Sequence, residues 1–200
     1  MSAKKLTVAI TLEGAKALVP GAAPLIGIAQ SLYSARGERF LRTIEERLSA
    51  LEDAEPDPER LASAIAEIQR RVLATPIDQQ DRLVNAAVNS AVSRSLAESD
   101  RRRFMLMLEY FSELHFRVLE ILSVVDDPHG GLADSLRGRV ERHTGSIDDQ
   151  VFSRVWGDLH RERLVAAREP NAMGTPGGMA GKRTEPLADS FLRFVSMPSE

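Results

Sequence analysis

The chain has 200 residues, of which 43% are hydrophobic and 28% are charged, a composition that is typical of globular proteins and excludes wholesale disorder. Its formal net charge of -3 argues against a dedicated nucleic-acid binder, because such proteins usually carry a basic excess. The absence of cysteine excludes disulfide frameworks, thiolate zinc sites and cysteine nucleophiles, and it fits a protein of the cytoplasm.

An apolar stretch without charge extends over residues 17–33. Glu13 and Lys16 come too early for a signal peptide, and Pro20 and Pro24 interrupt the stretch, so we expect neither secretion nor a membrane-spanning helix. In one interpretation, which we favour, its large side chains form the first turns of a core helix. In the other they contact a membrane surface, which would make the protein peripheral to that membrane. These side chains are Leu25, Ile26, Ile28 and Leu32.

Apolar side chains recur at three- and four-residue steps through most of the chain, which predicts a series of amphipathic helices. Pro24 suits the first turn of the first helix, and Asp57 followed by Pro58 is a typical start for the second. Residues 170–186 lack this periodicity and predict a long loop or a frayed hairpin. The expected helices cover roughly residues 24–51, 58–74, 79–98, 100–111, 113–125, 132–143, 147–165 and 187–195.

Two of these helices have a distinctive composition. The third, which Asp78 would cap, is rich in alanine and asparagine, and this predicts close packing against its neighbours. The fourth, with Ser99 or Asp100 as its cap, is apolar nearly all round between Phe104 and Phe111. Because a helix without a polar face is normally covered on all sides, we expect the fourth helix at the centre of a bundle.

Three consecutive arginines, Arg101, Arg102 and Arg103, stand at the beginning of the fourth helix. We interpret them as a solvated face that forms ion pairs with Glu98 and Asp100. The alternative interpretation is a contact with an anionic lipid or with nucleic acid.

From residue 113 the expected order is three helices, a Gly-rich segment and a closing helix. That order, with the segment Gly174–Thr184, resembles a winged-helix domain, in which a β-hairpin wing follows the recognition helix. The resemblance covers residues 113–195, although the Gly of the usual T-x-x-G junction is absent. The fold class that we expect is therefore mainly α, with a helical bundle over residues 1–112 and a winged-helix-like module over residues 113–200.

In DNA-binding winged helices the third helix enters the major groove, where basic side chains reach bases and phosphates. The resemblance therefore implies a nucleic-acid contact through one group of cations. Asp148 and Asp149 would face the phosphates unfavourably, and residues 113–200 hold more acidic than basic side chains, so we favour a protein-contacting or structural module over a DNA-binding one. The cations concerned are Arg154, Arg161, Arg163, Lys182 and Arg183.

A second resemblance spans residues 20–125. It rests on a Gly/Pro/Ala-rich apolar opening, on the run Arg39-Phe40-Leu41 with Ile44 and Leu48, and on the runs Arg103-Phe104-Met105 and Leu114-His115-Phe116-Arg117-Val118-Leu119. This layout resembles bacterial helical proteins of the abortive-infection alpha type. The resemblance implies a role in phage defence or at a prophage locus, without known catalysis.

No pattern in the sequence predicts a reaction. The histidines lack the spacing of a metal site, and His115, near a helix start, is best read as a partly buried, hydrogen-bonded side chain. No Gly-x-Ser-x-Gly elbow presents a nucleophile, and Gly174–Gly181 lacks the Gly-Lys-Ser/Thr of a phosphate-binding loop. Asp148-Asp149 suits the N-terminus of a helix. We therefore expect no catalytic, cofactor-binding or metal-binding residues and no small-molecule substrate.

We predict a non-enzymatic helical protein that acts by binding a protein partner or by self-association. This function predicts an exposed apolar patch beyond the few hundred Å² that is normal for a monomer. A winged-helix DNA-binding regulator and a membrane-associating effector remain as alternatives. In the C-terminal module we expect Trp156, the only tryptophan, to anchor the packing.

Overall fold

The computed structural model describes residues 35–51, 55–76, 79–93, 95–125, 135–166, 169–172 and 181–197. Asp78 and the residues 173–180 of the expected wing lie outside the described residues, as does the whole apolar N-terminal segment. Predictions that concern those parts of the chain stay predictions.

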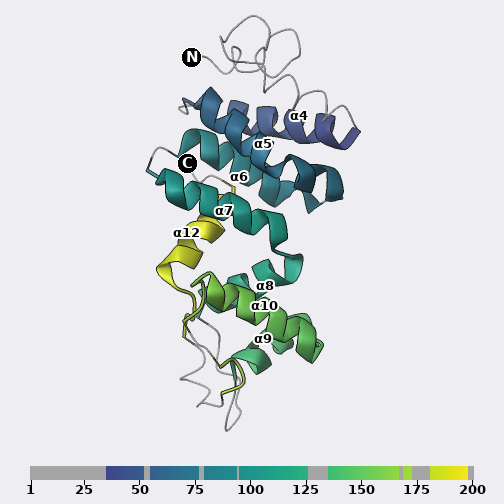
Figure 1. The fold of residues 1–200 in the computed structure, drawn as a ribbon, viewed down its shortest axis with the longest axis vertical. Coiled ribbons are helices and arrows are strands. Elements are labelled where there is room, and N and C mark those ends of the chain that lie inside the picture. The colour runs from purple at the N-terminus through teal and green to yellow at the C-terminus, as the bar shows by residue number, and fades with distance from the viewer. Residues whose placement is uncertain are drawn as a thin grey trace, which may run out of the picture. The chain divides into compact units, whose positions relative to one another are not determined.

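Within the described residues the chain forms eight α-helices and no strand, which confirms the prediction of a mainly α protein (Figure 1). The helices are α4 (Ala35–Ala50), α5 (Pro58–Ala74), α6 (Asp81–Val92), α7 (Glu98–Tyr110), α8 (Glu113–Ser123), α9 (Leu136–Thr144), α10 (Asp149–Arg161) and α12 (Pro186–Val195).

The chain divides into two compact units. Unit 1 contains the described residues up to Tyr110 together with those from Phe194 onward, and unit 2 contains Phe111–Arg193. The chain therefore leaves unit 1 after α7 and supplies a second piece of it near its C-terminus.

Unit 1 is built on the pair α5 and α6, which make its most extensive helix contact, and each of them also contacts α4 and α7 (Figure 1). The buried side of α4 consists of Phe40, Ile44 and Leu48, at the four-residue steps that the sequence predicted. Small side chains such as Ala86 and Ala87 are fully buried on α6. They let neighbouring backbones approach closely, as the composition of this helix predicted.

The start of α5 follows the sequence prediction. The side chain of Asp57 accepts hydrogen bonds from the backbone N–H groups of Glu59 at 2.9 Å and Arg60 at 3.1 Å, and Pro58 is the first helical residue. Two of the N–H groups that a helix start leaves without intrahelical partners are satisfied in this way.

The end of α6 differs from the prediction, because the helix ends at Val92 and not near residue 98. The backbone of Ser93 is extended. Two terminal carbonyl groups accept hydrogen bonds from the start of α5: Ala91 from the N–H of Asp57 at 2.9 Å, and Ser93 from the guanidinium of Arg60 at 2.9 Å. These long-range bonds satisfy groups that a longer helix would have paired locally.

Two predictions about α7 are wrong. The helix begins at Glu98, so Ser99 and Asp100 lie in its first turn and do not cap it. It is also not enclosed at the centre of a bundle, because Leu106 is 61% exposed and Tyr110 is 42% exposed. Buried side chains on its other side, which include Phe104, Met105, Met107 and Leu108, pack within unit 1.

Two buried asparagines of α6 bind the residues that return to unit 1 at the end of α12. Asn85 donates through its side-chain amide to the carbonyl of Val195 at 3.0 Å. Asn89 donates to the carbonyls of Phe194 at 2.8 Å and Ser196 at 2.9 Å. These side chains do the work of a C-terminal cap, because the last carbonyls of a helix have no intrahelical partners.

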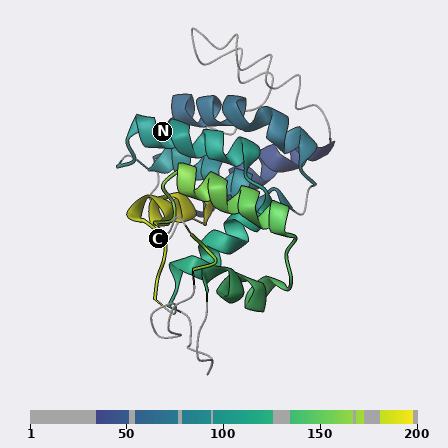
Figure 2. The same ribbon diagram turned by 60° about the horizontal axis from the view of Figure 1, so that its bottom comes forward.

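In unit 2, α8 contacts both α9 and α10 (Figure 2). The rings of Phe111, Phe116 and Phe191 form one cluster with centroid separations of 5.7 to 6.1 Å. Trp156 is buried, as predicted, and stacks on Phe152 with 5.9 Å between the centroids. Aromatic side chains from α8, α10 and α12 thus supply much of this core.

The short β-hairpin expected after α10 is not confirmed. Among the described residues this region makes a single antiparallel bridge, between Val165 and Thr184. The N–H of Glu185 donates to the carbonyl of Leu164 at 2.9 Å, and the N–H of Arg183 donates to the carbonyl of Leu122 at 2.8 Å. The two ends of the Gly-rich segment are therefore held together and held against α8.

A buried guanidinium ties these parts of unit 2 together. Arg139 of α9 donates to the carbonyl of Gly181 at 2.8 Å and to those of Ile121 and Val124 at 2.6 Å. One side chain thus donates hydrogen bonds to carbonyls at the end of α8 and to the carbonyl of Gly181, which lies in the part of the Gly-rich segment that leads to α12.

Candidate functional site

The exposed side of α7 is the strongest candidate for a functional surface on the described residues. We define the α7 outer face as Arg102, Arg103, Leu106, Glu109 and Tyr110. Leu106 and Tyr110 stand one helical turn apart, and Leu106 is among the most exposed large apolar side chains of the described residues. Its neighbour Arg102 is 71% exposed. The face therefore combines an aliphatic centre with aromatic and charged side chains around it.

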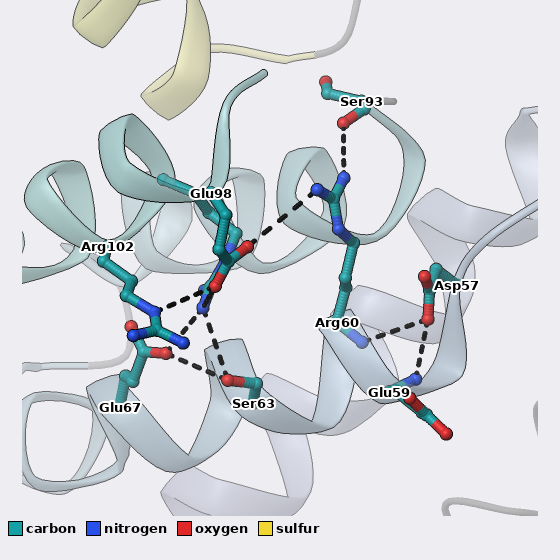
Figure 3. A network of polar contacts seen from close by, with 9 residues as sticks. Asp57, Glu59, Arg60, Ser63, Glu67, Ser93, Glu98 and Arg102 are labelled. Carbon is teal, nitrogen blue, oxygen red and sulfur yellow. Dashed lines mark hydrogen bonds and ion pairs between the residues drawn. The ribbon is translucent and has the colours of Figure 1, made fainter. Parts of the chain in front are cut away.

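The side of α7 that faces α5 holds a polar cluster centred on Arg101. Figure 3 labels four other members of this cluster, Ser63, Glu67, Glu98 and Arg102. Arg101 is only 2% exposed, and its guanidinium donates to Glu67 of α5 at 2.8 Å and to both carboxylate oxygens of Glu98 at 2.9 Å. Glu98 also accepts from Arg102 at 3.0 Å. Ser63 donates to Glu67 at 3.0 Å, which fixes the second carboxylate.

The Arg101 cluster corrects the interpretation of the three arginines as a solvated face. Arg102 is exposed and pairs with Glu98 as expected, but Arg101 is buried and cannot reach a lipid or nucleic acid. The hydrogen bonds from Arg101 lower the pKa of the Glu98 carboxyl to about 2, and the same bonds raise the pKa of the guanidinium. The cluster therefore stays charged and joins α5 to α7.

The five cations predicted to contact nucleic acid all lie in unit 2, but two of them are already engaged. Arg161 pairs with Asp158 at 2.5 Å, and Lys182 forms an ion pair with Asp189. Carboxylates beside both cations reduce the positive potential that a phosphate would meet. The remaining members are Arg154 and Arg163, which are exposed, and Arg183, which is half-buried.

Arg163 has an unusual backbone, with a positive φ of 55°. The N–H of Arg163 donates to the carbonyl of His160, and the N–H of Leu164 donates to that of Leu159, both at 2.9 Å. These two bonds form a Schellman motif at the end of α10, in a position that usually holds glycine. Arg163 therefore belongs to the C-terminal cap of α10 and not to a strand of a wing.

Ser112, His115 and Asp158 form a hydrogen-bonded chain in unit 2. Nδ1 of His115 accepts the backbone N–H of Ser112 at 3.0 Å, and the hydroxyl of Ser112 lies 2.9 Å from the same nitrogen. The imidazole proton therefore sits on Nε2, 3.3 Å from a carboxylate oxygen of Asp158. Burial lowers the pKa of His115, and the bond to Asp158 opposes that shift.

This chain resembles a catalytic triad in composition but works as a helix cap. The single lone pair of Nδ1 already accepts a backbone N–H, so it is not available to take a proton from the hydroxyl of Ser112. His115 occupies the third position of α8, where Glu or Gln closes a capping box, and its ring stacks on Phe111 at 4.6 Å. The prediction of a buried, hydrogen-bonded His115 is confirmed.

A shallow hollow lies on the surface of unit 2. It is lined by side chains of α8 and α9 and by Val124 just beyond α8: Arg117, Glu120, Ile121, Val124 and His143. The lining mixes both charges with aliphatic groups and offers no converging set of donors, so it indicates no particular ligand.

Two kinds of site have no counterpart in the part of the chain that the structure describes. It brings together no group of three or more His, Cys, Asp or Glu side chains suited to a metal ion. None of its helices is long and apolar enough to cross a membrane. The predicted membrane contact through Leu25, Ile26, Ile28 and Leu32 lies outside the described residues.

Comparison with known proteins gives no further guidance, since no protein family, no curated protein and no solved structure matches this chain. The sequence prediction missed the α7 outer face because it took an all-apolar helix to be enclosed. A usable signal was present: Arg102, Leu106 and Tyr110 recur at four-residue steps, which places a cation, an aliphatic and an aromatic side chain on one side of the helix.

Proposed function

We propose that this chain is a non-enzymatic helical interaction protein that binds a protein partner through the α7 outer face. The observation that carries the proposal is the 61% exposure of Leu106, a large aliphatic side chain among the charged and aromatic residues of the α7 outer face. Fully burying a leucine side chain contributes about 1.5–3 kcal/mol, so a partner that covers Leu106 gains directly from the contact.

The composition of the face supports a protein as the partner. Tyr and Arg are enriched at protein–protein interfaces, where tyrosine offers an apolar ring with a polar tip. Tyr110, Arg102 and Arg103 provide this combination around Leu106. Glu109 makes the face mixed in charge, which suits a protein better than a polyanion.

Site-specific photo-crosslinking tests the proposal. A benzoylphenylalanine replaces Leu106 in one variant and Arg42, an exposed residue of α4, in a matched control, both in cells that naturally contain the protein. We expect a discrete protein adduct from position 106 that the control position does not give. Equal labelling at both positions, or no adduct at position 106, would contradict the proposal.

The resemblance to abortive-infection alpha-type proteins would place this interaction in phage defence or at a prophage locus. We infer that the protein lowers phage yield and that it needs the α7 outer face to do so. The test compares phage plating on cells that carry the wild-type chain, L106D or no chain. Equal plating on all three would remove the link to defence but leave the interaction proposal standing.

A winged-helix DNA-binding regulator is the second candidate, because one observation favours it. In unit 2 three helices are followed by the antiparallel bridge between Val165 and Thr184 and then by α12, which is the element order expected for such a domain. The ion pairs of Arg161 and Lys182 count against it, since they leave few cations for phosphates.

Electrophoretic retardation of duplex DNA tests this candidate. If it is right, the wild-type chain retards DNA at low salt, and R154E/R163E, which reverses two exposed cations, abolishes the shift. Retardation should also weaken steeply as salt rises, because phosphate contacts release counterions. The absence of a shift at low salt would exclude it.

A further inference from the structure

We infer that the partner at the α7 outer face is a second copy of this chain, whose own α7 lies antiparallel to the first. The inference rests on the proposed function, because it names the occupant of the same surface. It follows from the way in which the charged and apolar side chains are arranged around Leu106.

Leu106 lies at the centre of the face, and the other four residues form two edges. In an α-helix, residues three and four positions away lie on either side of a central residue. Arg102 and Glu109, four before and three after Leu106, therefore share one edge. Arg103 and Tyr110, three before and four after it, share the other edge.

An antiparallel pair with a two-fold axis at Leu106 makes both edges complementary. In such a pair each edge meets the same edge of the other helix, running in the opposite direction. Arg102 then meets the partner's Glu109, and Arg103 meets the partner's Tyr110. The first contact is an ion pair and the second a cation–π contact, and the symmetry repeats both.

A parallel pair does not have this complementarity. Opposite edges would meet at equal heights, so Arg102 would lie beside the partner's Arg103, and like charges would repel. The pair that Arg102 forms with Glu98 does not prevent the antiparallel contact, because Arg102 is 71% exposed and such a surface pair contributes little. The pattern on α7 therefore selects the antiparallel arrangement.

The size of the face sets the strength of the dimer. A contact between two single helix faces falls below the roughly 1,200 Å² of total buried area at which stable interfaces begin. We therefore expect reversible association, with a dissociation constant in the micromolar range, on the order of other small transient interfaces.

Sedimentation velocity of the full chain over a range of concentrations tests the association. The wild type should shift from monomer to dimer as concentration rises, and L106D should remain monomeric. V151D is the matched control, because Val151 is an exposed apolar residue on a helix of unit 2, and it should dimerise like the wild type. A wild-type chain that stays monomeric throughout, or an L106D variant that still dimerises, would overturn the inference.

Charge reversal tests the orientation. R102E and E109R should each raise the dissociation constant at least tenfold, since each opposes like charges twice in the dimer. R102E/E109R restores opposite charges across the axis and should return the constant to within about threefold of the wild type. A double variant no tighter than the single variants would overturn the antiparallel pairing; circular dichroism and urea unfolding confirm that each variant is folded.

The crosslinking experiment separates this inference from the proposed function. An adduct between two copies of the chain at position 106 supports both. An adduct with a different protein, together with a monomeric chain in the centrifuge, refutes the second copy but supports an interaction protein. No adduct and no dimer would refute both.

Discussion

At Arg101 the cost of removing a guanidinium from water is offset by two carboxylates, from Glu67 and Glu98. Both acids keep partial contact with solvent, with side-chain exposures of 33% and 45%. The arginine therefore joins α5 to α7 without creating an isolated buried charge, which would be far more costly than a paired one.

We predict that Arg101→Met lowers the free energy of unfolding by about 2 kcal/mol. Breaking a fully buried ion pair costs roughly 3–5 kcal/mol, and the partial exposure of Glu67 and Glu98 reduces that cost because both can rehydrate. The matched control is Arg102→Met, which removes an exposed partner of the same Glu98 and should change stability by less than about 0.5 kcal/mol. Urea unfolding measures both, and equal effects would refute a structural role for Arg101.

His115 should make stability depend on pH. Burial lowers its pKa in the folded state below the ordinary value of about 6.5, so the unfolded chain binds the proton more tightly. The contribution of His115 is therefore fully present above that ordinary value and is lost as pH falls toward the lower, folded-state pKa.

The variant His115→Gln isolates this titration, because glutamine completes a capping box with Ser112 and has no proton to gain. We expect its urea midpoint to vary less than that of the wild type between about pH 7.5 and pH 5. His143→Gln, at an exposed histidine, is the matched variant. If His115→Gln keeps the wild-type dependence on pH, another group is responsible for it.

At the element scale, local sequence predicted which segments are helical but not where each one ends. The start of α5 was predictable because its cap, Asp57, is a neighbour in sequence. The end of α6 was not, since its last carbonyls are bound by the start of α5, some thirty residues away. The α7 outer face was missed for a related reason: composition shows that residues 104–111 are mostly apolar, but not which sides of the helix its neighbours cover.

Helix α10 packs through four buried side chains, and Trp156 is the largest of them. Trp156 is buried against Phe152, and we predict that Trp156→Ala lowers the free energy of unfolding by about 3–5 kcal/mol. Trp156→Phe keeps a stacked ring and should lose distinctly less. Tryptophan fluorescence vanishes in both variants, so circular dichroism in urea is the measurement. A loss below 1 kcal/mol for alanine would contradict an anchoring role.

At the scale of the whole molecule, composition predicted a mainly α chain, but nothing local indicated that the end of α12 and the residues after it complete unit 1. Asn85 and Asn89 look like ordinary polar members of an alanine-rich helix. Their role depends on carbonyl groups far along the chain. Asn85 binds the carbonyl of Val195, 110 residues later, and Asn89 binds that of Phe194, 105 residues later. Hydrogen bonds between residues so far apart in the sequence produce no periodic pattern in either segment.

We predict that Asn89→Ala destabilises the protein by about 1–3 kcal/mol, since buried carbonyls lose their donor. Its neighbour Ser90 is the matched control. The Ser90 hydroxyl is buried and has no hydrogen-bond partner among the described residues, so Ser90→Ala should be neutral or stabilising. Urea unfolding compares the two. Equal losses would show that the cost is one of packing and not of hydrogen bonding.

The return of residues 194–196 to unit 1 has a consequence for biosynthesis. The ribosome makes α4 to α7 first, then the whole of unit 2, and only afterwards the carbonyls that Asn85 and Asn89 bind. Until those residues clear the exit tunnel, the nascent first unit lacks Phe194, whose ring lies 5.4 Å from that of Phe104. Unit 1 therefore stays incompletely packed while the later residues are translated, and chaperones can bind it during that time.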